Sequence, residues 1–205
     1  MIDKSSRYLN TQSGVYSESL HGLAITSGDL ICTTSGVDDI LVGEFWRFLG
    51  RLVPGEVDHV IVYLGPDGLC VEAGPRGVNL FVFFDGEWVS KKMIEQRGPY
   101  VDRLVGIAYP LAGRGFSSGM EHSIREQMRN FCLSQAKKKK PYNLNFFNPD
   151  TEDAFYCSQL PYQAYIQHGI NLNTGLGLPD LIGSEAIIFP QEIWASCVHK
   201  SVPEN

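Results

Sequence analysis

A β-hairpin between residues 57 and 73 constrains the fold of this chain more than any other stretch. Residues 57–64 are rich in β-branched side chains and almost wholly apolar, which is typical of a strand in the middle of a sheet. Residues 65–68 read Gly-Pro-Asp-Gly, a turn in which proline fixes φ and glycine takes a left-handed conformation. Residues 69–73 return as a second strand, so the sequence predicts an antiparallel sheet built on this hairpin.

Two polar residues interrupt the hairpin, and a four-residue turn brings them to the same face. Such a turn pairs Leu64 with Leu69. Ile61 then lies opposite Glu72, and alternation along the strand puts Ile61 on the face of His59. Glu72 becomes the diagonal neighbour of His59, at about 7–8 Å between backbones, which a glutamate can span. A three-residue turn would separate the two side chains, and each alone is typical of a satisfied core histidine or a rim carboxylate.

The second informative stretch is Phe-Tyr-Cys-Ser-Gln-Leu at residues 155–160, where a loop becomes a helix. Backbone N–H groups are unpaired at a helix start and the helix dipole favours negative charge, so a thiol there is shifted toward thiolate. Pro161 is tolerated only near the first turn, so the helix should begin at or just after Cys157. Taken alone, Cys157 is more typical of a small buried apolar residue than of a nucleophile.

Together these residues predict a nucleophile, a base and an orienting carboxylate. Histidine titrates near neutral pH, so His59 can take the proton of Cys157, while Glu72 holds the imidazole ring. The thiolate would attack a carbonyl carbon, with the Cys157 backbone N–H stabilising the oxyanion. The imidazolium would protonate the leaving amine, and water would hydrolyse the thioester.

Composition excludes several other classes of protein. The chain has 205 residues, 43% of them apolar and 20% charged, which suits one globular domain over residues 1–205. A net charge of −6 argues against nucleic acid, and no apolar run approaches the ~18 residues of a membrane span. Five widely spaced cysteines without a CxxC pair give no reason to expect a metal, a disulfide framework or a cofactor, and they favour the reducing cytoplasm.

The remaining segments complete a predicted α+β fold. Apolar periodicity predicts further strands at residues 77–83 and 103–109 and helices at 41–52, 118–136 and 191–197, the last after Pro190. Three segments stay outside this pattern: an N-terminal arm at residues 1–22, an insert at 84–102 that we interpret as a lid or specificity element, and a C-terminal extension at 171–205.

The order of these motifs resembles a known family. Gly-Asp-Leu at residues 28–30, the His59 strand, Val-Glu-Ala at 71–73 and Tyr-Cys-Ser-Gln-Leu at 156–160 look like the YiiX-like amidases, permuted relatives of the NlpC-type cell-wall peptidases. The resemblance spans roughly residues 27–170. It implies a circularly permuted papain-like fold, with an antiparallel sheet packed against the helix that bears the Cys nucleophile. It also implies Cys157 as nucleophile, His59 as base and Glu72 as orienter.

Two other classes of function compete with this prediction. An acyltransferase resembling lecithin retinol acyltransferase would use the same thioester, but that group typically carries a second histidine where Glu72 stands and a membrane anchor. A non-catalytic binding module on the same fold would leave Cys157 poorly aligned. For an amidase or peptidase we expect a small peptide or amino-acid amide as substrate; a homo-oligomer stays open. The candidate substrate-binding aromatic residues are Tyr63, Tyr142, Phe155 and Tyr156.

Overall fold

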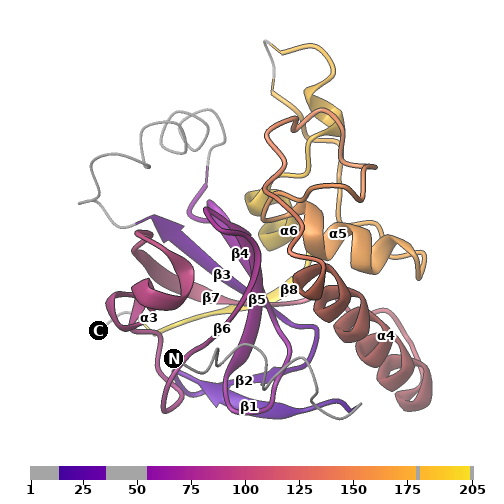
Figure 1. Ribbon diagram of the computed structural model, residues 1–205. Helices are drawn as coiled ribbons and strands as arrows, with labels where there is room; N and C mark the ends of the chain where they lie inside the picture. Colours follow the sequence, from indigo (N-terminus) through magenta and orange to yellow (C-terminus); the bar gives the residue numbers. More distant parts are fainter. Residues whose placement is uncertain (1–13, 36–54, 179–180, 204–205) are drawn as a thin grey trace.

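The computed structural model describes residues 14–35, 55–178 and 181–203 (Figure 1). The predicted helix at residues 41–52 therefore lies outside the described residues. In the described part, the fold is mixed α+β and its main sheet is antiparallel throughout. The strands are β1 (Ser17–Leu20), β2 (Leu23–Thr26), β3 (Leu30–Ser35), β4 (His59–Tyr63), β5 (Leu69–Gly74), β6 (Gly77–Val82), β7 (Asp102–Tyr109) and β8 (Val198–Ser201). The helices are α3 (Ser90–Arg97), α4 (Ser118–Lys137), α5 (Gln159–Ile166), the 3-10 turn η1 (Ser184–Ala186) and α6 (Pro190–Ser196).

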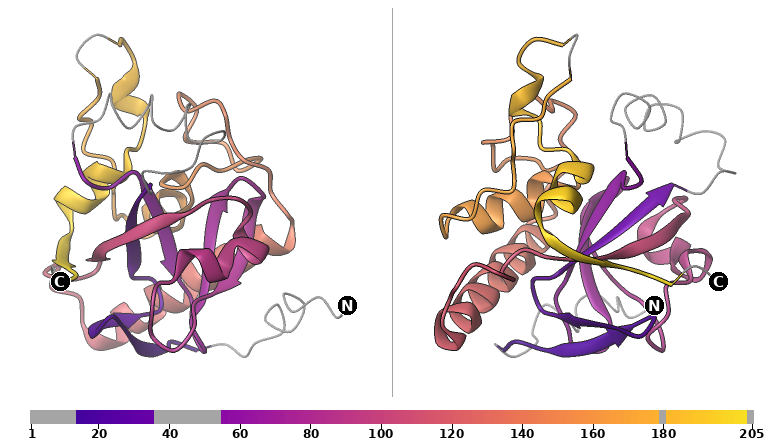
Figure 2. Two further views of the ribbon diagram at one scale, coloured as in Figure 1. Left: turned by 90° about the vertical axis from the view of Figure 1, so that its left-hand side faces the viewer. Right: turned by 180° about the vertical axis from the view of Figure 1, so that it is seen from behind.

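Six strands form the main sheet in the order β6-β5-β4-β3-β7-β8, and β1 pairs with β2 in a separate two-stranded sheet. Helices α4, α5 and α6 lie on one side of the main sheet, and α3 lies on the other (Figures 1 and 2). Successive side chains of β4 point alternately to these two sides of the sheet. Val60 and Val62 belong to the core cluster shared with α4, α5 and α6, whereas Ile61 and Tyr63 belong to the cluster on the α3 side.

Several predicted elements are confirmed. Strands β6 and β7 lie where apolar periodicity placed them, and α6 begins with Pro190 as its first residue. Helix α5 begins at Gln159, two residues after Cys157, which puts Pro161 in its first turn. The nucleophile candidate thus precedes the helix instead of lying within it.

Several elements were not predicted, among them β2 and η1. The arm assigned to residues 1–22 contains β1, the 84–102 insert contains α3, and the C-terminal extension adds β8 to the edge of the main sheet beside β7. All four residues of β8 are exposed, and β1 buries only Leu20. Strands without a buried apolar face lack the alternation by which strands are recognised in a sequence.

Candidate functional site

The β4–β5 hairpin has the register that the four-residue turn predicted. Val62 pairs with Val71 and Tyr63 with Cys70. The Leu64 N–H donates to the Leu69 carbonyl at 2.8 Å. A Cβ on Gly68 would come within 2.4 Å of the Phe83 carbonyl oxygen, and φ at Gly68 is +72°, so only glycine fits this end of the turn.

This register brings His59 and Glu72 together. His59 Nε2 lies 2.8 Å from Glu72 Oε2, and both side chains are buried. Because Nε2 is committed to the carboxylate, Nδ1 is the ring nitrogen left to face Cys157. The Tyr100 ring meets the His59 ring edge-on, with centroids 5.2 Å apart. The imidazole is therefore fixed by a hydrogen bond on one side and an aromatic contact on another.

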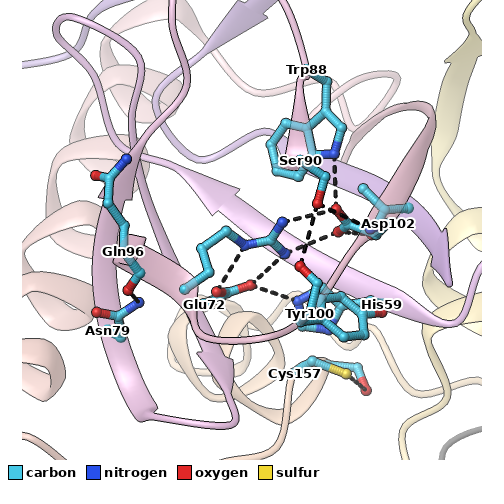
Figure 3. A network of polar contacts seen from close by, with 12 residues as sticks. His59, Glu72, Asn79, Trp88, Ser90, Gln96, Tyr100, Asp102 and Cys157 are labelled. Carbon is cyan, nitrogen blue, oxygen red and sulfur yellow. Dashed lines mark hydrogen bonds and ion pairs between the residues drawn. The ribbon is translucent and has the colours of Figure 1, made fainter. Parts of the chain in front are cut away.

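Glu72 is held in turn by a fully buried arginine. Arg97 Nε donates to Glu72 Oε1 at 2.9 Å, and Arg97 Nη2 donates to Oε2 at 2.7 Å. The same guanidinium donates from Nη1 and Nη2 to the two carboxylate oxygens of Asp102, at 2.8 and 2.9 Å. His59, Glu72, Arg97 and Asp102 thus form one connected chain of charged groups (Figure 3).

Asp102, the end of this network farthest from His59, is held by residues from three other parts of the fold. Asp102 accepts from Thr33 Oγ1 on β3 at 2.8 Å and from Trp88 Nε1 at 3.0 Å, while its backbone N–H donates to Ser90 Oγ on α3. Aromatic rings also surround the guanidinium of Arg97, with centroids 4.8–5.4 Å from its central carbon. These rings are Phe81, Trp88 and Tyr100.

The electrostatics of the site follow from these contacts. Burial alone would raise the pKa of Glu72 and of Asp102, but the charge and hydrogen bonds of Arg97, together with the interaction with His59, outweigh burial and hold both pKa values below their ordinary values. Burial alone would lower the pKa of His59. Hydrogen bonding and charge from Cys157 and Glu72 outweigh burial and raise the pKa of His59 to about 10. The ring is therefore protonated at neutral pH.

Cys157 is presented to His59 by a loop that Gln159 holds from inside. The Gln159 side chain accepts from the Tyr156 N–H at 3.1 Å and donates to the carbonyls of Pro149 and Thr151 at 3.0 and 2.9 Å. Gln159 has no exposed surface. Cys157 lies beside His59 and Tyr100 in Figure 3, and it acts on the ring of His59 as described above. Each of the five cysteines is a buried free thiol, so burial alone does not distinguish Cys157.

A small pocket of about 20 Å³ opens beside His59. That volume holds about one water molecule or a group of similar size. Strands β4 and β5 pair only at Val62–Val71 and Tyr63–Cys70, and the pocket lies beyond these pairs, between the start of β4 and the end of β5. Its lining residues are Asp58, His59, Ala73, Gly74, Pro75, Tyr100 and Tyr142.

The four aromatic residues predicted to bind substrate divide into two groups. Tyr142 lines the pocket. The other three lie in the core because their rings are needed for packing. Tyr63 stacks near Phe83, Phe155 meets a ring of α4, and the Tyr156 hydroxyl accepts from the Ile188 N–H at 3.1 Å. The structure does not bring Tyr63, Phe155 or Tyr156 to the wall of this pocket.

Sequence reasoning missed Arg97, Tyr100 and Asp102, which all come from one short stretch. Arg97 ends α3, Asp102 opens β7, and Tyr100 lies between them. The stretch belongs to the 84–102 insert, whose role as a lid or specificity element stays a prediction. The available signal was weak: an arginine and an aspartate five residues apart, flanking Gly-Pro-Tyr.

The fold and the site thus define a mixed α+β protein with a buried Cys-His-Glu cluster backed by an arginine and an aspartate. Comparison with protein-family models, with curated proteins and with solved structures finds no match. Among the described residues, no three His, Cys, Asp or Glu side chains are grouped as metal ligands. None of the described helices is long and apolar enough to cross a membrane.

Proposed function

We propose that this chain is a cysteine-dependent amidase or peptidase in which Cys157, His59 and Glu72 act as nucleophile, base and orienter. The observation that carries the proposal is the geometry of His59, which bonds to Glu72 through Nε2 and faces Cys157 with its other side. The proposed fold is the circularly permuted papain-like one, supported by the motif order and the antiparallel sheet.

In the proposed reaction, the Cys157 thiolate attacks the carbonyl carbon of an amide and a tetrahedral oxyanion forms. The carbon–nitrogen bond then breaks as His59 gives its proton to the leaving amine, which leaves a thioester on Cys157. Water attacks the thioester while His59 takes its proton, and the carboxylic acid and thiolate are released. Glu72 stays ionised throughout and holds the ring in one orientation.

Two groups are suited to stabilise the oxyanion. The Cys157 backbone N–H is the first, and the Tyr142 hydroxyl, which interacts with the Cys157 backbone, is the second. Tyr142 also lines the pocket beside His59. The pocket takes a group about the size of one water molecule, so it can receive only the part of a substrate next to His59; the proposed substrate class, a short peptide or an amino-acid amide, rests on the resemblance described above.

The proposal is tested by alkylating the folded protein with iodoacetamide over a range of pH and measuring each cysteine by mass spectrometry. We expect Cys157 to react fastest, and to slow at neutral pH in His59→Ala. The matched control is His122→Ala, which removes an exposed histidine on α4 and should change nothing. Inert Cys157, or indifference to the loss of His59, would leave a binding module as the better interpretation.

A second measurement distinguishes hydrolysis from transfer. Wild type and Cys157→Ser are incubated with a panel of amino-acid amides and short peptides, and intact protein is weighed for an acyl adduct on Cys157. Release of free acid supports the amidase or peptidase. Release only when an alcohol or amine acceptor is added supports the acyltransferase instead.

A further inference from the structure

The Arg97–Asp102 pair lies directly behind the candidate catalytic residues. Arg97 Nη2 bonds to Glu72 Oε2, the same oxygen that bonds to His59 Nε2. A second bond, from Arg97 Nε to Glu72 Oε1, prevents the carboxylate from rotating. A forked arginine contact of this kind fixes both position and plane of a carboxylate. The orientation of His59 therefore depends on Arg97 through a single shared oxygen atom.

Charge counting gives Asp102 a separate role. Glu72 and Arg97 alone sum to zero, which would leave the His59 imidazolium facing a neutral pair. Asp102 adds one negative charge through its own forked contact with Arg97 at 2.8 and 2.9 Å. The three groups then sum to −1, so Asp102 adds a net negative charge to the buried groups behind His59. A negative charge nearby favours the protonated form of a histidine, and this effect is strong at a site with so little exposed surface.

We infer that Arg97 and Asp102 are positioning residues for His59: Arg97 fixes the Glu72 carboxylate, and Asp102 restores the negative charge that Arg97 cancels. The catalytic meaning of this inference rests on the function proposed above. Its physical content, the effect of Asp102 on His59, does not require that function.

A comparable ion pair elsewhere in the molecule separates positioning from mere stability. Arg125 on α4 bonds to Asp29 at 2.8 Å, and both side chains are buried. Asp29 precedes β3, whereas His59 pairs with Thr33 further along that strand. Loss of the Arg125–Asp29 pair should therefore cost stability without changing His59.

Several groups besides Asp102 bear on the titration of His59, and Asp102→Asn and Asp29→Asn leave them in place. Glu72 and Cys157 interact with the ring directly, and the others line the pocket with it. The latter are Asp58, Tyr100 and Tyr142.

The test compares full-length wild type, Asp102→Asn and Asp29→Asn. The His59 ring is followed by NMR on histidine-labelled protein between pH 6 and 10.5, with His59→Ala used for assignment, and Cys157 alkylation is measured at pH 7. An opposite charge nearby changes a pKa by about 1–3. We expect Asp102→Asn to lower the His59 midpoint by at least about one pH unit and to slow alkylation by about tenfold.

Asp29→Asn should leave both readouts unchanged. The inference is overturned if Asp102→Asn leaves the His59 midpoint unchanged, or if Asp29→Asn changes it as much. Should Asp102→Asn not fold, Arg97→Lys replaces it, because lysine keeps the positive charge but cannot make the paired hydrogen bonds to Glu72 and to Asp102. Arg97→Lys should slow alkylation while moving the His59 midpoint less; alkylation at the wild-type rate would contradict the role given to Arg97.

These outcomes are independent of the proposed function. If Asp102→Asn moves the His59 midpoint but wild type cleaves no amide, the positioning role stands and the amidase proposal fails. If wild type forms an acyl adduct and Asp102→Asn leaves both readouts unchanged, the amidase proposal stands and the positioning role fails.

Discussion

Replacing Arg97 by methionine should destabilise the fold by an amount that depends on pH. The change keeps much of the side-chain volume but removes four charge-assisted hydrogen bonds and leaves two carboxylates, Glu72 and Asp102, only 1% and 5% exposed. Removing one partner of a buried ion pair typically costs about 3–5 kcal/mol. Since domains are stable by about 5–15 kcal/mol in total, we expect a folded but marginal variant at pH 7.

The pH dependence follows from the signs of the pKa changes. In wild type, the pKa values of Glu72 and Asp102 are lowered, because the charge and hydrogen bonds of Arg97, together with the interaction with His59, outweigh burial. That stabilisation is present above their unfolded values, about 4.3 and 3.9, and is lost as pH falls through the lower folded values. In Arg97→Met burial acts with less opposition, so the folded state holds its carboxyl protons more tightly than the unfolded chain. The variant therefore loses stability as pH rises, and its deficit relative to wild type is largest near pH 7.

The deficit is measured by urea unfolding followed by circular dichroism at pH 4.5, 5.5, 6.5 and 7.5. The matched control is Arg76→Met, because Arg76 is exposed and donates to two backbone carbonyls of α3, those of Glu95 and Gln96. Exposed substitutions of this kind usually change stability by less than about 0.5 kcal/mol. A deficit for Arg97→Met below about 1 kcal/mol, or one that is constant across this pH range, would refute the reasoning.

Two further predictions concern the surroundings of Cys157. Gln159→Met removes the partners of the Tyr156 N–H and of two loop carbonyls; at about 1–3 kcal/mol for each unsatisfied buried group, it should lower the urea midpoint clearly and slow Cys157 alkylation, and an unchanged rate would mean that the loop keeps its shape without this clamp. Tyr100→Ala removes one wall of the pocket, so it should speed the reaction of Cys157 with a bulky iodoacetyl reagent relative to iodoacetamide, whereas Tyr100→Phe keeps the ring and should leave that ratio unchanged.

The part of the site that could be predicted from sequence is the part held by local geometry. The pairing of His59 with Glu72 depends on the length of one turn, and that length was visible as Gly-Pro-Asp-Gly between two apolar strands. The start of α5 was equally local, because Pro161 restricts where a helix can begin. Turn chemistry and proline act within a few residues, so both predictions needed no knowledge of the tertiary fold.

The part that escaped prediction depends on buried polar side chains. Helix α3 buries Ser90 and Arg97 together with Met93, so its buried positions show no apolar period. An arginine in a segment of mixed polarity has the same appearance in a sequence whether it is solvated or fully enclosed. Only its partners distinguish the two, and one of them, Glu72, lies 25 residues earlier in the chain.

The residues of the site are brought together by the pairing of strands that are distant in sequence. Strand β3 pairs with β4 on one side, where Thr33 faces His59, and with β7 on the other, where Asp102 lies at the end of the ladder. Thr33 also donates to Asp102, so the strand that aligns the histidine aligns the carboxylate at the far end of the chain of charges. His59 and Asp102, the two ends of the network, are thus both fixed to β3, and Glu72 and Arg97 connect them. A rigid link of this kind is what His59 would need, as the proposed base, to face Cys157 in a single orientation.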